Sequence, residues 1–245
     1  GRTTPEQPPP LLATGLGAGR GQRRLGSTTG VPPNLRQATR WLEKAGQQGH
    51  IEAQVLLARL NLVESGDQSD ARVAAGLFHA AAPAKANYPE AMKWARMAAD
   101  GGHADAQSLL AFILTNGPEG SRNQAEADSW YKRAAEGDSG PGHLGHALAL
   151  ARDMTVPGVQ EEVVKHLHRA SEQNVVAAQF LYAMLAERGV EVPKDDALAR
   201  DLYRKAAMQG HRSAQSRWGY ILLKGIGMPA NTVEGESWLR RAALA

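Results

Sequence analysis

The chain has 245 residues, a formal net charge of +3 and no cysteine. The lack of cysteine excludes a disulfide framework and a thiolate zinc site. The sequence also contains no run of about 18 apolar residues, the length needed to span a bilayer. Residues 1–31 carry four arginines against one glutamate, and the remainder is balanced in charge. This balance argues against nucleic-acid binding, because phosphate contacts need clustered, uncompensated Lys and Arg.

Residues 1–31 are predicted to be a flexible lead. They contain Pro8, Pro9 and Pro10 and no long periodic apolar pattern, so they cannot bury enough surface to offset the entropy of ordering. The apolar stretch 11–16 is too short for a secretory signal, but the arginine-rich composition would also suit an organellar transit peptide. We expect a soluble protein of the bacterial cytoplasm or periplasm, or of an organelle if the lead is such a peptide.

From Asn34 onward the chain repeats itself with a period of 36 residues. One predicted helix of each unit, called here the B helix, holds a large anchor residue followed four positions later by alanine. The anchors are Trp41, Trp94, Trp130, His166, Leu202 and Trp238. Seven residues before each anchor lies a position that, in five of six units, can cap a helix start by accepting hydrogen bonds from free amides. These positions are Asn34, Asn87, Asn123, Val159, Asp195 and Asn231.

A second helix, called here the A helix, follows each B helix after a glycine-containing turn. It opens with a small residue and usually glutamine, at Ala53-Gln54, Ala106-Gln107, Gly142-His143, Ala178-Gln179 and Ala214-Gln215. A single hairpin of this length cannot bury its apolar stripe alone, so neighbouring hairpins must stack. The sequence therefore predicts an all-α fold, a right-handed α-solenoid of antiparallel helix pairs.

The first interval, from Asn34 to Asn87, is 17 residues longer than the 36-residue period. Residues 70–82 show the offsets of a B helix, and residues 87–100 show B-helix features again. An A helix is therefore missing between them. We predict an extra, unpaired helix near residues 87–100 and a local change in curvature within a repeat region that spans residues 32–245.

Two stretches carry a resemblance to a known family. Residues 178–207 read A-Q-F-L-Y-A-M-L-A-E-R-G-V and then D-D-A-L-A-R-D-L-Y-R-K-A-A, and residues 214–243 read A-Q-S-R-W-G-Y-I-L-L-K-G-I-G and then W-L-R-R-A-A. These units resemble Sel1-like repeats, relatives of tetratricopeptide repeats, over roughly residues 34–245. Residues 139–173 depart most from the pattern. The resemblance implies a superhelix with a concave face, used as an adaptor that assembles protein complexes.

The histidines form two groups, and neither predicts a metal site. His50, His103 and His211 occupy the same turn of different units, about 10 Å apart or more, whereas metal ligands converge within a few ångströms. The second group lies in the divergent unit and lacks a carboxylate partner in a recognisable motif. It comprises His143, His146, His166 and His168. We predict a turn role for the first group and a core role for the tryptophans, whose helical spacing is typical of packing.

Two columns on the A-helix face that core packing leaves free predict a partner-binding surface. Arg152, Arg188 and Lys224 form a basic stripe at the 36-residue period, beside apolar positions. This pairing suits a partner segment with acidic and apolar residues, or a free carboxylate. Alternatively, the three cations only offset helix dipoles, by about 0.3 to 1 kcal/mol each. The predicted concave site comprises Phe112, Asn116, Arg152, Met184, Arg188, Tyr220 and Lys224.

The sequence predicts a non-enzymatic interaction scaffold that binds a partner peptide or domain. No nucleophile elbow, P-loop or paired-carboxylate motif is present, so we assign no catalytic residue and no cofactor. Two alternatives stay open. The chain lacks an initiating Met and stops inside a unit, as the regulatory segment of a larger enzyme would, and its uncapped end would also suit self-association.

Overall fold

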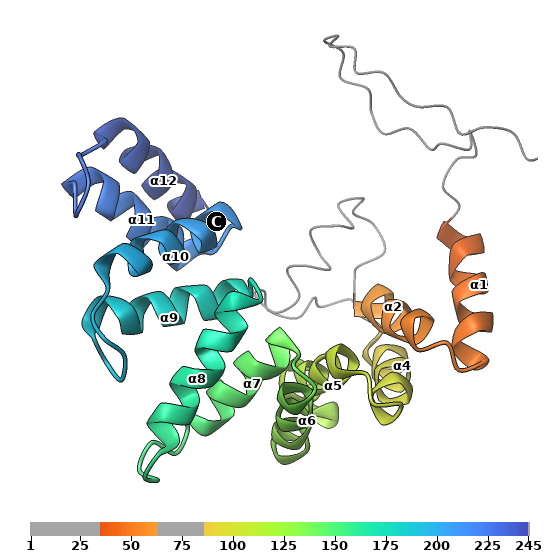
Figure 1. The fold of residues 1–245 in the computed structure, drawn as a ribbon. Coiled ribbons are helices and arrows are strands. Elements are labelled where there is room, and N and C mark those ends of the chain that lie inside the picture. The colour runs from red at the N-terminus through yellow and green to blue at the C-terminus, as the bar shows by residue number, and fades with distance from the viewer. Residues whose placement is uncertain (1–34, 63–85, 245) are drawn as a thin grey trace, which may run out of the picture.

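The computed structural model describes residues 35–62 and 86–244. Within these ranges the chain is helical and contains no strand, and successive helices pack in series along an open arc (Figure 1). The arc begins at α1 (Leu35–Gln47) and ends at α12 (Thr232–Leu244). The predicted all-α solenoid is confirmed. None of the helices in the described ranges combines the length and the apolar character needed to cross a membrane.

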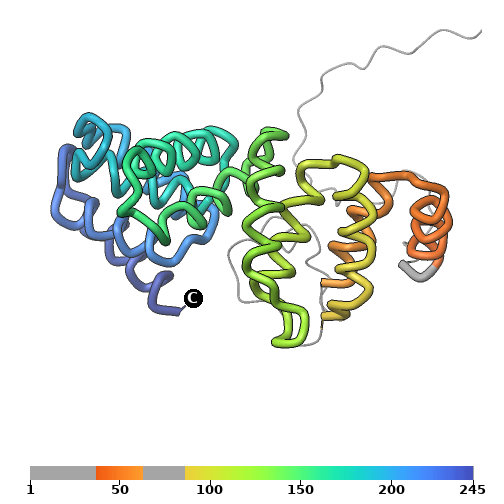
Figure 2. Tube along the Cα trace, turned by 90° about the horizontal axis from the view of Figure 1, so that it is seen from below, coloured from red at the N-terminus to blue at the C-terminus, as the bar shows by residue number. Residues whose placement is uncertain are grey.

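Helical hairpins follow α1, each made of an A helix and a B helix. The A helices are α2 (Ile51–Leu62), α5 (Ala104–Asn116), α7 (Gly140–Leu150), α9 (Val176–Arg188) and α11 (Arg212–Lys224). Their B partners are α4 (Tyr88–Asp100), α6 (Gln124–Glu136), α8 (Val159–Glu172), α10 (Asp196–Met208) and α12. A short 3₁₀ turn, η1 (Glu119–Ser121), lies between α5 and α6. Figure 2 shows the hairpins stacked side by side along the chain, so that each one buries its apolar stripe against its neighbours.

The B helices begin at the predicted capping residues. Asn123 Oδ1 accepts a hydrogen bond from the Glu126 amide at 3.2 Å, which satisfies a free donor of the first turn of α6. The same role is confirmed for Asn87, Asp195 and Asn231. At the fourth predicted position α8 instead begins after Gly158, whose φ of 82° suits a residue without a side chain. Asn34 lies outside the described residues.

The A helices are tied to the preceding B helix by a buried glutamine. Nε2 of Gln54 donates to the carbonyl of Gly46 at 2.8 Å, and Gln107 and Gln215 make the same bond at 3.3 Å to the carbonyl eight residues earlier. A buried side-chain amide needs such a hydrogen-bond partner, because leaving it unpaired costs about 1 to 3 kcal/mol. In these three hairpins the glutamine therefore fixes where the A helix starts against the end of the helix before it, whereas Gln179 bonds to Asn174 and Gln209 instead.

Two members of the histidine column serve the turns, and two members of the tryptophan column serve the core, as predicted. Nδ1 of His103 accepts from the Ala106 amide at 3.3 Å, and Nδ1 of His211 accepts from the Ala214 amide at 3.2 Å, so both cap an A helix. Trp94 and Trp130 are buried between helices. Trp41 differs, since it is 62% exposed in the first described helix.

Close approach of helices α6 and α7 depends on Gly145. A Cβ atom added there would overlap Cδ1 of Tyr131, well inside the van der Waals contact distance of two carbon atoms. The glycine therefore admits the buried Tyr131 side chain into the helix interface. The apolar core continues on either side of this crossing, through one cluster over α2 to α6 and two clusters over α7 to α12.

The predicted unpaired helix near residues 87–100 is instead a regular B helix. Helix α4 packs along α2, and the Asn87 amide donates to the Asn61 carbonyl at 2.7 Å. The Asn123 amide makes the equivalent bond to the Leu114 carbonyl at 2.9 Å in the next hairpin. The extra residues thus fall between the A and B helices of one hairpin, and the predicted helix over residues 70–82 lies outside the described residues.

Candidate functional site

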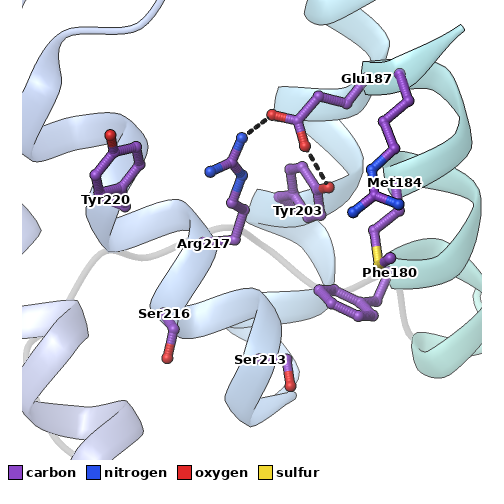
Figure 3. A pocket seen from close by; sticks show the side chains of 9 residues that line it. Phe180, Met184, Glu187, Tyr203, Ser213, Ser216, Arg217 and Tyr220 are labelled. Atoms are coloured by element: carbon purple, nitrogen blue, oxygen red, sulfur yellow. Dashed lines mark hydrogen bonds and ion pairs between the residues drawn. The ribbon is translucent and has the colours of Figure 1, made fainter.

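A groove lies between α9 and α11, the A helices of two successive hairpins. It has a volume of about 640 Å³, and its walls come from one face of each helix because the lining residues follow three- and four-residue spacings. Figure 3 shows these side chains around the opening, with Tyr203 of α10 behind Glu187 and Arg217. The lining residues are Phe180, Met184, Glu187, Arg188, Tyr203, Ser213, Ser216, Arg217 and Tyr220.

A polar network joins the walls of the groove. The Tyr203 hydroxyl donates to Oε2 of Glu187 at 2.8 Å, and Arg217 donates to Oε1 of the same carboxylate (Figure 3). Burial raises the pKa of Glu187, but the hydrogen bonds from Arg217 and Tyr203 outweigh it, so this pKa lies below its ordinary value. Burial and the bond to Glu187 raise the pKa of Tyr203. Glu187 is therefore ionised and Tyr203 protonated at neutral pH.

Arg217 is held between two aromatic rings. Its guanidinium carbon lies 6.0 Å from the ring centroid of Tyr203 and 5.5 Å from that of Tyr220. Such cation–π contacts contribute about 0.5 to 1 kcal/mol each at exposed sites. Together with the ion pair to Glu187 they fix the guanidinium in the groove, while Tyr220 remains 42% exposed to solvent.

Positive charge exceeds negative charge around the groove. Arg188 and Lys224 are exposed, and neither has an ion-pair partner within residues 35–62 and 86–244. Glu187, the acidic residue of the lining, is already paired with Arg217. A ligand in the groove therefore meets uncompensated cationic side chains beside apolar and aromatic surface.

The structure brings three of the predicted site residues together. Met184, Arg188 and Tyr220 line the groove, and Lys224 lies one turn beyond Tyr220 at the end of α11 without lining it. Met184 is half-buried and the other three side chains are exposed.

The other three predicted residues lie elsewhere. Phe112 is 6% exposed, so its expected place on a free face is wrong. Asn116 donates a hydrogen bond to the Phe112 carbonyl at 3.1 Å, and Arg152 is paired with Asp128. The basic stripe is therefore interrupted at Arg152, where the charge is compensated.

Sequence reasoning missed the polar centre of the groove. Glu187 stands where the units before and after hold Ala151 and Leu223, and Arg217 stands 36 residues after Leu181. The available signal was that two charged residues, in adjacent units, stand at repeat positions where the neighbouring units hold apolar residues. Outside the groove, and within the described ranges, no three histidine or acidic side chains converge as metal ligands would.

The sequence and the fold define a class of helical-repeat protein. The sequence model of the Sel1 repeat matches residues 19–50, 71–103, 104–139, 176–211 and 212–245. The chain therefore belongs to the Sel1 repeat family. The matched segments skip residues 140–175, which form the hairpin α7–α8 and include most of the stretch predicted to be divergent.

Solved structures support the same class. A Sel1 repeat protein from Oxalobacter formigenes is 27% identical with a TM-score of 0.64, over 87% of this chain and 78% of that one. A protective antigen from uropathogenic Escherichia coli strains, which has the Sel1-like fold, is 26% identical with a TM-score of 0.57, over 84% of this chain and 48% of that one. This chain thus spans about half the antigen's length. No curated protein matches the sequence. Sel1 repeat proteins are generally non-catalytic scaffolds for protein interactions.

Proposed function

We propose that this protein is a non-enzymatic scaffold that binds a partner protein in the groove between α9 and α11. The observation that carries the proposal is Arg217, fixed by Glu187 and by two tyrosine rings at the centre of the groove. A preorganised side chain loses little conformational entropy on binding. Tyrosine and arginine also dominate the binding energy of many protein interfaces.

The groove favours an extended partner segment with one acidic and one apolar side chain. Phe180, Met184 and Tyr220 offer apolar surface to the apolar side chain. Arg188 supplies an unpaired cation to the acidic one, and charge-assisted hydrogen bonds of this kind are about twice as strong as neutral ones. Lys224 adds attraction at the edge, which speeds association more than it raises affinity.

The test is capture of a partner by the full chain from cells that produce it, followed by a binding titration with the purified partner. The double variant Tyr220→Ala with Arg188→Glu removes the exposed aromatic ring and reverses the charge of the groove. We expect its dissociation constant to rise at least about 30-fold, because truncation of a central aromatic anchor costs about 2 kcal/mol or more.

The matched control is Met208→Ala with Arg240→Glu, which makes the same kinds of change at exposed positions of α10 and α12 outside the groove. It should bind as the wild type does, and circular dichroism should be equal for all three proteins. An unchanged dissociation constant for the groove variant would refute the proposed site.

A further inference from the structure

The hairpin α7–α8 departs from the repeat at two columns at once. His143 stands where the other A helices hold Gln54, Gln107, Gln179 and Gln215. His166 stands where the B helices hold tryptophan or leucine, as at Trp130 and Leu202. The glutamine fixes the start of the A helix in three hairpins, and the anchor is a buried core residue at Trp94, Trp130 and Leu202. The hairpin α7–α8 thus has titratable histidines at two positions where the other hairpins have residues with structural roles.

The two exchanged histidines contact each other. Nδ1 of His143 lies 2.7 Å from Nδ1 of His166, with ring centroids 5.0 Å apart. Such a contact is a hydrogen bond only when one nitrogen carries the hydrogen and the other offers its lone pair. Nε2 of His143 lies 3.1 Å from Oδ1 of Asp138 and so carries a hydrogen. In the neutral pair His143 therefore accepts at Nδ1 and His166 donates.

A third ring and several charged groups surround this pair. His146 meets the His166 ring edge-on at 4.8 Å, and its buried Nδ1 has no hydrogen-bond partner in the described part of the chain. From α9 the ring of Tyr182 contacts His168 rather than the pair. The charged groups that face the cluster are Lys132 and Glu136 of α6, Asp138 of the following turn, and Glu162, Lys165 and Arg169 of α8.

These surroundings favour the neutral forms of His146 and His166. Burial, followed by the neighbouring rings of His146 and His143, lowers the pKa of His166 to about 4, although Glu162 opposes the shift. Burial and the charge of Lys132 lower the pKa of His146. The rings of His146 and His166 are therefore uncharged at neutral pH, and the hairpin is closed around them.

Counting protons shows how the contact ends. With one added proton, the charged ring still donates from Nδ1 and the neutral ring still accepts, so the contact survives. With two added protons, both Nδ1 atoms carry hydrogen and neither can accept. Two like charges at this separation also repel each other. The second proton is therefore incompatible with the observed geometry.

We propose that His143 and His166 form a pH-sensitive joint between α7 and α8, which opens when both rings are protonated. The joint lies between the core cluster of α2 to α6 and that of α9 to α12. Leu144, Val163 and Leu167 pack beside it and belong to the cluster that links these two. Opening therefore loosens the middle of the solenoid while both ends keep their cores.

Hydrogen exchange of the full chain, read by mass spectrometry on peptides of each hairpin, tests this proposal. Protection factors are compared because they divide out the intrinsic pH dependence of exchange. Between pH 7 and pH 4.5 we expect the protection factors in α7 and α8 to fall at least about tenfold more than those in α4 to α6 or α10 to α12. The reason is that each proton bound only in the open form changes the opening equilibrium by up to about tenfold per pH unit. An equal change in all hairpins would overturn the proposal.

The variant His143→Gln with His166→Leu restores residues that the repeat uses at these two columns. It should abolish the extra loss of protection, whereas His168→Gln, at an exposed histidine of α8, should retain it. Retention in the double variant would overturn the proposal. Should that variant fail to fold, NMR of wild-type protein labelled at histidine decides instead. The proposal requires the His166 ring to titrate at a lower pH than a histidine in a short peptide, and titration at the same pH would contradict it.

Discussion

Glu187 of α9 and Arg217 of α11 form an ion pair that joins the A helices of two successive hairpins. The pair replaces apolar residues of the repeat columns, and Tyr203 of the intervening α10 completes it by donating to the same carboxylate. A repeat whose core consists largely of alanine and leucine thus has a charged contact between two A helices at this junction. This contact holds Arg217 in the groove.

Loss of the Glu187 carboxylate should weaken the fold slightly and disorder Arg217. We expect Glu187→Gln to lower the free energy of unfolding by about 1 kcal/mol, because both side chains are about one third exposed and solvent screens the pair. Urea denaturation measures this change. Glu236→Gln removes an exposed pair within α12 and should cost less than about 0.5 kcal/mol. Equal costs for the two variants would argue against a special role for Glu187.

The crossing of α6 and α7 should tolerate no side chain at Gly145. Gly145→Ala places Cβ against the buried ring of Tyr131, and we expect a loss of about 2 to 3 kcal/mol, since overpacking forces the ring or the backbone to shift. Thermal denaturation followed by circular dichroism detects it. Gly120→Ala is the control, because nothing lies within 4 Å of its added Cβ. A Gly145→Ala protein that melts with the wild type would show that the helices can separate without cost.

Stability should fall on acidification through the buried histidines. Folding lowers the pKa of His166 from 6.5 to about 4, so the unfolded chain binds the proton first. Stability from this group is complete above pH 6.5 and is lost as pH falls from 6.5 towards 4, by up to about 3 kcal/mol. Burial lowers the pKa of His146 and of His211 too, and both act in the same direction.

Asp138 acts in a separate, more acidic window. Hydrogen bonds from Arg169 and His143 lower its pKa, so its contribution is present above its ordinary value of 3.8 and disappears below it. Urea unfolding at pH 7, 5.5 and 4.5 therefore reports mainly the histidines, and His166→Leu should flatten the profile. A wild-type profile that rises as pH falls from 7 to 4.5 would contradict the assignment.

The period of the sequence was sufficient to predict the hairpins. Capping side chains such as Asn123 are required by local backbone geometry, and small residues such as Ala134 by the same helix contact in every hairpin, so both recur at a constant spacing and can be found without a structure. The pairing of α4 was mispredicted because a repeat count cannot tell an insertion between units from one inside a hairpin. The Asn87 to Asn61 hydrogen bond decides this, and it is a tertiary contact.

The candidate site was predicted only in part, for a related reason. Column positions locate Met184, Arg188 and Tyr220 on the A helices, but exposure depends on the neighbouring hairpin. Phe112 occupies the same column as Tyr220, yet Phe112 is buried and Tyr220 is exposed. Glu187 and Arg217 act as a pair across two units, and their contact follows from how α9 and α11 pack rather than from either sequence alone.

Site-specific photo-crosslinking detects whether a partner lies in the groove between α9 and α11, as proposed. A photoreactive amino acid replaces Tyr220 in one protein and Met208 in another; both positions are exposed, but Met208 lies outside the groove. We expect a covalent adduct with the captured partner from position 220 and none from position 208. An adduct from position 208 with none from position 220 would contradict it.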